Sequence, residues 1–424
     1  MKKFILFSLL AGVVFVILYL TANPMPSYLQ ERTYLDMEED ILEAFILAKD
    51  SSTIHLPEGH FLFTQELSLN GKKHVTITGM GMDKTVLSFK GQTKGAQGIL
   101  ISNSENITIE NMTLEDASGD NLKITDSDTV VIRNLRSAWT GKVSSANGAY
   151  GIYPVLCSNL LIENCEAIGA SDAGIYVGQS DQVVIRNNKA FYNVAGIESE
   201  NSTNVEIYGN EVYENTSGLL IFNLPKLTRY GKDVKAYNNT LYNNNIKNFG
   251  VKGSIVSAVP KGTGVVIMAT QNVQFYNNTV KNHKTSNLSV VSYHIFAADE
   301  DKAQETLSAE VEEQGIRAVN YDFRSDNSYN PYPGQVEIVN NSFENEYSLP
   351  TLSNDYGILM WLKNKVHIPD VVYDGILPEG STLQDQAHKL CLNENGTINF
   401  VYLDAANDFE AFSNDQEIFK CSLN

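Results

Sequence analysis

Positive charge is scarce in this sequence. Its 424 residues include 50 Asp and Glu but only 31 Lys and Arg, which gives a formal net charge of −19. A chain with this balance repels a polyanion over most of its surface. No basic stripe interrupts the excess of acids. The composition therefore argues against nucleic acid as a partner.

Residues that bind transition metals or haem are also few. The seven histidines are scattered, with no pair at the spacing of metal ligands, so we expect no dedicated zinc or copper site. The sequence has no Cys-x-x-Cys-His motif, which excludes covalently attached haem. Turns rich in Asp and Asn, such as Glu115–Asn121, offer oxygen ligands. Calcium is therefore the one cofactor that the sequence leaves open.

The first residues carry a targeting signal. Lys2 and Lys3 precede the apolar to weakly polar run Phe4–Ala22, whose 19 residues approach the ~20 that span a bilayer. Cleavage after this run would place Leu20 where a small residue is required. We therefore favour a signal anchor over residues 1–22, with the lysines cytoplasmic, over a cleaved signal peptide. Either interpretation predicts an exported protein, in the periplasm or at the cell surface.

A short alternation of apolar and polar residues, ending in a turn, recurs along the chain. The period of two predicts strands. The copies are ITIENM from Ile107, VVIRNL from Val130, LLIENC from Leu160, VVIRNN from Val183, VEIYGN from Val205, VKAYNN from Val234, VQFYNN from Val273 and VEIVNN from Val336. Successive copies start 22 or 23 residues apart, with longer steps where residues are inserted. Such a fixed step indicates a solenoid.

A second strand follows each first strand. Its copies are YGIYPV, AGIYVG, AGIESE and SGLLIF, whose glycines are Gly151, Gly174, Gly196 and Gly218. Two or three short strands per turn, stacked in parallel, predict an all-β fold, the right-handed parallel β-helix. Residues 23–343 would form this body with its N-terminal cap, and residues 344–424 an irregular C-terminal capping region.

The N-terminal cap is predicted to be a helix. The segment Asp36–Lys49 is amphipathic, with Ile41, Leu42, Phe45 and Ile46 placed on one side. Because an open solenoid end exposes unpaired strands, we expect this helix to cover the first coil.

Two features of the first strand are predicted to be structural. Asparagine pairs end several copies, where Asn tolerates left-handed backbone and where stacked amides can form a ladder. These pairs are Asn187-Asn188, Asn238-Asn239, Asn277-Asn278 and Asn340-Asn341. The outward side chains of the same strand form a column of alternating charge that continues as tyrosine. Its members are Glu110, Arg133, Glu163, Arg186, Tyr208, Tyr237 and Tyr276.

The four cysteines divide into two pairs. Cys157 and Cys165 lie within one coil, where we expect small buried thiols. Cys391 and Cys421 are the candidates for a disulfide, because it would staple the tail that the repeat does not cover. An oxidising compartment permits that bond.

The outward face of the second strands is the predicted functional surface. If Ile152 and its equivalents point inward, one outward column reads Lys123, Tyr153, Tyr176, Glu198, Leu220, and the next reads Thr125, Val155, Gly178, Glu200, Phe222. Tyrosine faces stack on sugar C–H groups, and charged groups bind hydroxyls. The predicted substrate-binding residues are Tyr153, Tyr176, Glu198, Glu200, Lys123 and Trp139. The competing interpretation is a long β-helix that exposes such residues without a ligand.

Three stretches carry a family resemblance over nearly the whole chain beyond the anchor. They are SNGAYGIYPV, ASDAGIYVGQS and YNVAGIESENSTN. They resemble the exported right-handed parallel β-helix repeat proteins found near dihaem c-type cytochromes in bacterial genomes. That resemblance implies a c-type cytochrome as a partner, and an acidic surface suits docking to a basic cytochrome. More distantly, GAYGIYPV is similar to the Tyr-Gly-(Ile/Phe)-Asp-Pro-His motif of mannuronan C5-epimerases, which are carbohydrate-acting β-helix proteins.

The epimerase resemblance is incomplete. Tyr150 matches the family's tyrosine and Pro154 its proline, but Tyr153 replaces the aspartate and Val155 the histidine. Epimerisation needs a group that neutralises the uronate, a base and an acid, and the two replaced residues are the best suited at neutral pH. The motif therefore argues against a working epimerase centre.

Two functions follow from these residues, and a third is implied by the resemblance to the proteins found near dihaem cytochromes. We favour binding of an extracellular saccharide or uronate polymer along a groove on the solenoid. The alternative is a polysaccharide lyase or epimerase-like enzyme, with Tyr150 as acid or base, Lys142 as the neutralising charge and Asp172 as a third catalytic residue. The last is a periplasmic scaffold for a c-type cytochrome.

Overall fold

The structure is a computed structural model that describes residues 33–295, 323–365, 367–394 and 396–421. The predicted anchor, residues 1–22, lies outside the described residues. The chain divides into two units, residues 1–34 and 35–424, and the second contains all the elements discussed below. Among the described residues, no helix is both long and apolar enough to cross a bilayer.

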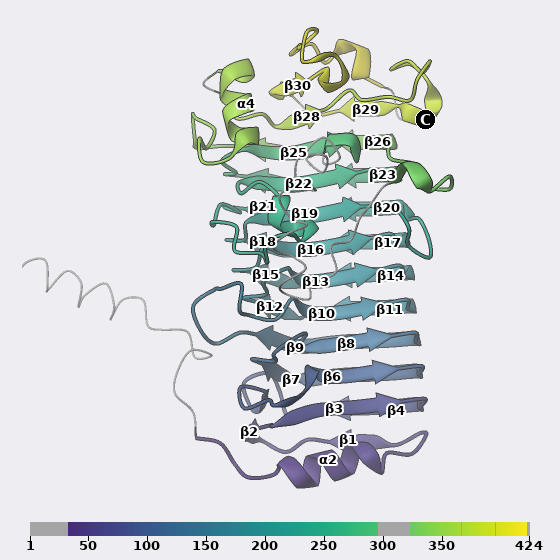
Figure 1. The fold of residues 1–424 in the computed structure, drawn as a ribbon, viewed down its shortest axis with the longest axis vertical. Helices are drawn as coiled ribbons and strands as arrows, with labels where there is room; N and C mark the ends of the chain where they lie inside the picture. The colour runs from purple at the N-terminus through teal and green to yellow at the C-terminus, as the bar shows by residue number, and fades with distance from the viewer. Residues whose placement is uncertain (1–32, 296–322, 366, 395, 422–424) are drawn as a thin grey trace, which may run out of the picture. The chain divides into compact units, whose positions relative to one another are not determined.

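The second unit is a stack of coils whose strands form two parallel sheets, drawn in Figure 1 as parallel arrows. The second sheet consists of β3 (Gln65–Asn70), β6 (Lys94–Ser102), β8 (Leu122–Thr125), β10 (Tyr150–Val155), β13 (Ala173–Gly178), β16 (Ala195–Glu200), β19 (Ser217–Phe222), β22 (Thr263–Met268), β25 (Ser286–Val291), β28 (Val371–Tyr373) and β30 (Phe400–Tyr402). Each strand pairs with the equivalent strand of the next coil. This arrangement confirms the predicted parallel β-helix.

The first sheet bends, so most coils contribute two strands to it. The strands before the bend are β1 (Thr53–His55), β4 (Lys73–Thr78), β7 (Glu105–Glu115), β9 (Asp128–Ala138), β11 (Ser158–Glu163), β14 (Asp181–Arg186), β17 (Thr203–Tyr208), β20 (Lys232–Tyr237), β23 (Gln271–Tyr276), β26 (Gly334–Val339) and β29 (Leu390–Asn393), and β7 and β9 continue through it. The strands after the bend are β2 (Gly59–Leu62), β5 (Thr85–Ser88), β12 (Glu166–Ile168), β15 (Lys189–Phe191), β18 (Glu211–Tyr213), β21 (Thr240–Tyr242), β24 (Thr279–Lys281) and β27 (Ser342–Glu344).

The core follows from the alternation in the sequence. In the second sheet Ile152 pairs with Ile175, Ile175 with Ile197, and Ile197 with Leu219. Each of these side chains is at most 1% exposed. Because successive side chains of a strand point to opposite faces, their neighbours must point out of the coil. The core thus fixes which residues reach the outer face.

The predicted asparagine ladder is confirmed at the bend. The first residue of each pair has left-handed backbone, as at Asn187 with φ of 55°. The second residue is buried and bonds the next coil, so the amide of Asn188 donates to Asn210 at 3.0 Å and that of Asn210 to Asn239 at 2.9 Å. These amides satisfy backbone groups that a bend leaves without strand partners.

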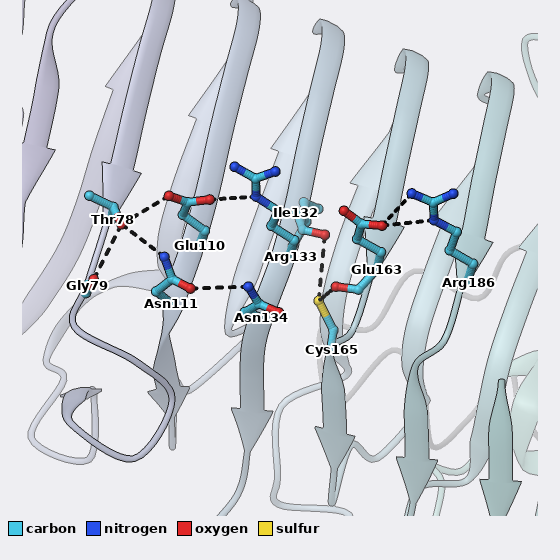
Figure 2. Close-up of polar contacts among 10 residues, drawn as sticks. All are labelled: Thr78, Gly79, Glu110, Asn111, Ile132, Arg133, Asn134, Glu163, Cys165 and Arg186. Atoms are coloured by element: carbon cyan, nitrogen blue, oxygen red, sulfur yellow. Dashed lines mark hydrogen bonds and ion pairs between the residues drawn. The ribbon is translucent and has the colours of Figure 1, made fainter. Parts of the chain in front are cut away.

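The outward charge column of the first sheet is also confirmed. Figure 2 shows Arg133 facing Glu110 and Arg186 facing Glu163, each pair at 2.6 Å across neighbouring strands. Further along the column, the rings of Tyr208 and Tyr237 stack with centroids 4.8 Å apart. Cross-strand pairs of this kind contribute about 0.2–1 kcal/mol each to the stacking of the coils.

The N-terminal cap is a helix, as predicted. Helix α2 (Glu38–Ile46) buries Ile41 and Phe45, and Glu38 accepts hydrogen bonds from the backbone and hydroxyl of Thr64. The prediction was wrong for Ile46, which is 73% exposed. It is the last residue of the helix and lies one step around the helix from Phe45, away from the coil.

The C-terminal region adds strands that the repeat did not predict. Strand β28 pairs with both β25 and β30, and β29 pairs with β26, so both sheets continue past residue 344. Helix α4 (Asp355–Asn364) lies beside them, capped by the side chain of Asn354. The short helices η4 (Gln386–His388), η5 (Ala405–Asn407) and η6 (Glu417–Phe419) occupy the connections.

Both predictions for the cysteines are confirmed. Cys391 and Cys421 form a disulfide with Cα atoms 5.5 Å apart. Cys157 and Cys165 are free and buried. Burial raises the pKa of each of these two thiols to about 12, so neither is a thiolate at neutral pH.

Candidate functional site

The strand register brings the predicted residues together on the outer face of the second sheet. Lys123 of β8 pairs with Tyr153 of β10, and Tyr176 of β13 pairs with Glu198 of β16. Glu200 pairs with Gly178 in the next outward column. Both outward columns read as the sequence predicts.

Three tyrosines contact one another at the centre of this face. The ring centroid of Tyr150 lies 4.4 Å from that of Tyr153 and 4.6 Å from that of Tyr176, and the last two are 4.9 Å apart. Tyr176 lies across Gly178, where an added Cβ would be 2.3 Å from the tyrosine hydroxyl. Glycine at that position makes room for the ring. Tyr176 is buried, whereas Tyr150 and Tyr153 are half-buried.

Four carboxyl groups surround the tyrosines. Glu198 and Glu200 lie two residues apart on β16, so both point outward, and they are 2% and 9% exposed. Asp172 directly precedes β13 and is half-buried. Asp120 lies two residues before β8, is 6% exposed and accepts a hydrogen bond from the backbone of Tyr150 at 3.2 Å. We call these four carboxyl groups and the three tyrosines the aromatic–carboxylate cluster.

Burial sets the protonation of this cluster. It raises the pKa of Asp172 to about 8, with the negative charge of Glu200 acting in the same direction. Burial raises the pKa of Glu200 to about 7, although a hydrogen bond from Tyr176 opposes the shift. The pKa of Glu198 is raised well above its usual range by burial, then by Asp172 and Glu200. At neutral pH the cluster therefore holds protons and carries less charge than its four carboxyl groups suggest.

Lys123 is the cation that the structure places at the cluster. Its Nζ lies 4.7 Å from the ring centroid of Tyr153, within the range of a cation–π contact. Its charge also lowers the pKa of Asp120, against a larger upward effect of burial. Lys142, the predicted neutralising residue, is exposed in the loop between β9 and β10. Lys123 occupies the place in the site that we expected for Lys142.

Trp139 does not present its ring to a ligand, contrary to our expectation. It is 5% exposed, and its indole N–H donates to the carbonyl of Ala117 at 3.0 Å. The ring lies so close to Gly148 that an added Cβ there would be 2.7 Å from it. Trp139 directly follows strand β9, and its indole packs against Ala117 and Gly148, so the ring lies between coils.

The Asp- and Asn-rich turn Glu115–Asn121 does not fit calcium. Asp116 accepts from the backbone and hydroxyl of Thr140, and Asn121 accepts from the backbone of Ala117. These oxygens are thus committed to donors of the chain itself. In the ranges that the structure describes, no group of three or more His, Cys, Asp or Glu side chains is placed to hold a metal ion.

Insertions cover the outer face beyond the cluster. The loops 223–231 and 323–332 are joined by the hydroxyl of Tyr329, which donates to the carbonyl of Asn223 at 2.8 Å, and by Asp326, which accepts from Lys226 and Tyr230. They pack on an apolar cluster continuous with Tyr176. The predicted groove is therefore filled over β19, β22 and β25, and the aromatic–carboxylate cluster lies at the margin of the covered part.

Sequence reasoning missed Asp120. The residue lies in a turn 30 positions before Tyr150, and only the stacking of two coils brings them together. A signal was nevertheless present, because Asp120 and Asp172 both lie within two residues of the start of a second strand.

A family model described as a right-handed β-helix region matches residues 67–228 and 142–295, which together span more than half of the chain. The chain belongs to the right-handed β-helix family. No curated protein matches it. The handedness that the sequence predicted is thus confirmed for this right-handed β-helix protein.

Several solved structures are similar at low identity. The A-module of mannuronan C-5 epimerase AlgE4 from Azotobacter vinelandii is 14% identical, with 86% of this chain and 92% of that chain covered and a TM-score of 0.47. An alginate lyase from Paenibacillus is 14% identical over 60% and 88%, with a TM-score of 0.42. An exopolygalacturonase from Thermotoga maritima is 13% identical over 62% and 87%, with a TM-score of 0.36.

Proposed function

We propose that this β-helix protein binds an extracellular saccharide at the aromatic–carboxylate cluster. The observation that carries the proposal is the mutual contact of three tyrosines beside four carboxyl groups on one outer face. An exposed ring face stacks on the C–H groups of a pyranose. A carboxyl group that holds a proton both donates and accepts, which matches a sugar hydroxyl.

The half-buried rings of Tyr150 and Tyr153 are the accessible part of the cluster. Below them, Tyr176, Glu198 and Glu200 are buried, and the ring of Tyr176 packs against both outer rings. A saccharide would contact the two outer rings and Asp172. This arrangement supports a binding site in which the rim contacts the sugar ring and the deeper carboxyl groups lie within reach of a substituent on that ring.

The test is the affinity of the Tyr153→Ala variant for saccharides. Titration of the full-length protein with neutral, amino and uronate oligosaccharides identifies a ligand for the wild type. Tyr153→Ala should weaken its binding about tenfold, because a lost stacking contact costs about 1.4 kcal/mol. Tyr237→Ala, on the first sheet, is the matched control and should bind normally. An unchanged affinity of Tyr153→Ala, or an equal loss in the control, would contradict the proposal.

Acid–base catalysis on a uronate polymer is the second candidate. One observation favours it: burial places the pKa of Glu200 at about 7 and that of Asp172 at about 8, so carboxyl groups here can exchange protons near neutrality. The hydroxyl of Tyr150 hydrogen-bonds Asp172. Proton NMR of mannuronan and pectate with the protein over a day would reveal inverted or unsaturated uronates, and Tyr150→Phe should abolish them. Unchanged spectra would exclude this chemistry for those polymers.

Three expectations from the sequence stay predictions. They are export, the signal anchor of residues 1–22 and a c-type cytochrome partner. A cytochrome complex held by the acidic surface should weaken as salt is added. Size-exclusion chromatography with a dihaem cytochrome at two salt concentrations tests it.

A further inference from the structure

The aromatic–carboxylate cluster contains a nearly buried carboxyl group to which no described residue donates a hydrogen bond. Glu198 is 2% exposed, and among the described residues the structure gives it no hydrogen bond or ion pair. The nearby charges that act on it are the carboxyl groups of Asp172 and Glu200. Buried polar groups are almost always satisfied, so an unpartnered one in a candidate site points to a missing hydrogen-bond partner.

The charges at the site determine which donor fits. A uronate would add a negative charge beside these carboxyl groups, and it would repel each of them that ionises. An ammonium group would supply both the hydrogen-bond donors and the opposite charge. Tyrosine faces add to its binding through the cation–π interaction.

At the rim of the cluster, the ammonium group of Lys123 already lies beside both a tyrosine ring and a carboxyl group. Its ammonium group lies over the face of Tyr153 and interacts with Asp120. At the other end of the cluster, Tyr176 and the carboxyl groups of Glu198 and Glu200 form the same combination of ring and acid. In the described part of the chain, no lysine or arginine forms an ion pair with these two glutamates.

We propose that the ligand is a saccharide with a free primary amine, an amino sugar, whose ammonium group is bound by Glu198, Glu200 and Asp172 beside Tyr150 and Tyr176. The inference rests on the proposed saccharide binding and names the class of sugar. The sequence favoured a saccharide or uronate polymer, and this inference replaces the uronate with a cationic sugar. The ammonium group gives Glu198 the partner that the chain does not provide.

Ammonium binding has a measurable consequence. A cation favours the ionised form of the carboxyl groups beside it, so their pKa values fall and protons leave the protein. An anionic uronate would have the opposite effect and would draw protons in. A neutral sugar would change the proton count little. The sign of proton transfer on binding therefore reports the charge of the ligand.

The experiment is calorimetric titration of the full-length protein with hexamers of glucosamine, N-acetylglucosamine and mannuronate. Titration at pH 6, in two buffers of different ionisation enthalpy, gives the number of protons exchanged. At this pH a free amine is largely charged, below its usual pKa of about 8. We expect the glucosamine hexamer to bind at least tenfold more tightly than its acetylated form and to release protons.

Glu198→Gln is nearly isosteric and should abolish the preference for the amine. Glu337→Gln, on the outer face of the first sheet, is the control and should keep it. If Glu198→Gln does not fold, the inference is tested by two wild-type measurements alone. They are the preference for the glucosamine hexamer over its acetylated form and the number of protons released on binding. Equal or tighter binding of the acetylated or mannuronate hexamer would overturn the amino-sugar inference and leave saccharide binding intact. No binding of any hexamer would overturn both.

Discussion

The asparagine ladder makes a quantitative prediction at Asn215. This side chain is fully buried, and its Nδ2 donates to the carbonyl of Ala190 and to Oδ1 of Asn244, both at 2.9 Å. Its Oδ1 accepts from the backbone N–H of Asn193 at 2.9 Å and from the Nδ2 of Asn193 at 3.0 Å. Asn215→Ala removes all four bonds and leaves the backbone N–H of Asn193 without its acceptor.

The expected cost is large for a single substitution. Each buried hydrogen bond contributes roughly 1 kcal/mol net, so losing four lowers the free energy of unfolding by about 4 kcal/mol. That is a large fraction of the roughly 5–15 kcal/mol by which a folded domain is stable. The ladder would then be a main determinant of how the coils stack.

Urea denaturation followed by circular dichroism measures this cost. Asn327→Ala is the control, because Asn327 is exposed in a loop, and its free energy of unfolding should change by less than about 0.5 kcal/mol. A loss below about 1 kcal/mol for Asn215→Ala would refute the reasoning, since strand pairing alone would then fix the stacking.

Three further predictions concern stability. Gly196→Ala should lower the melting temperature by several degrees, because its Cβ would lie 2.3 Å from a methyl of Val212, whereas Gly141→Ala meets nothing and should not. Burial holds the pKa of Glu200 at about 7, above the usual 4.5, so the folded state binds more protons and stability falls as pH rises from 5 to 8. The free energy of unfolding should fall by about 3 kcal/mol less between pH 5 and pH 8 in Glu200→Gln than in the wild type, measured by urea denaturation at both pH values. Cys391→Ser should cost about 2–4 kcal/mol by the same assay; no loss would mean that the staple is dispensable.

The repeating body was predictable because each coil meets the same physical demands at the same place. A bend in every coil requires left-handed backbone, which Asn187, Asn238 and Asn277 adopt. A core on one side of each strand requires alternation, and that alternation fixes which residues point outward. Both outward columns follow from the sequence for this reason.

The features that the sequence did not predict depend on contacts between segments far apart in the chain. Asp120 reaches Tyr150 only because coils stack, and the pairing of loop 223–231 with loop 323–332 has no local signal. The strand Val371–Tyr373 has three residues and no repeat spacing, so its pairing with two other strands could not be read from a pattern. Trp139 resembles a surface aromatic in sequence, and only the structure places its indole between coils.

The protonation of the site was equally beyond the sequence. Glu198 and Glu200 are acids on an outward column, and the sequence alone suggests exposed, ionised groups. In the structure they are buried beside Tyr176 and Asp172, which raises their pKa values. The sequence alone therefore does not reveal that these groups hold protons at neutral pH.

The most direct test of the central claim is to find where on the protein a saccharide binds. With ¹³C-labelled tyrosine rings, NMR spectra of the full-length protein can be recorded with increasing amounts of the hexamer that binds best. We predict shifts of the signals of Tyr150, Tyr153 and Tyr176, with the stacked Tyr208 and Tyr237 of the first sheet unchanged. Shifts confined to the first-sheet tyrosines would contradict the claim.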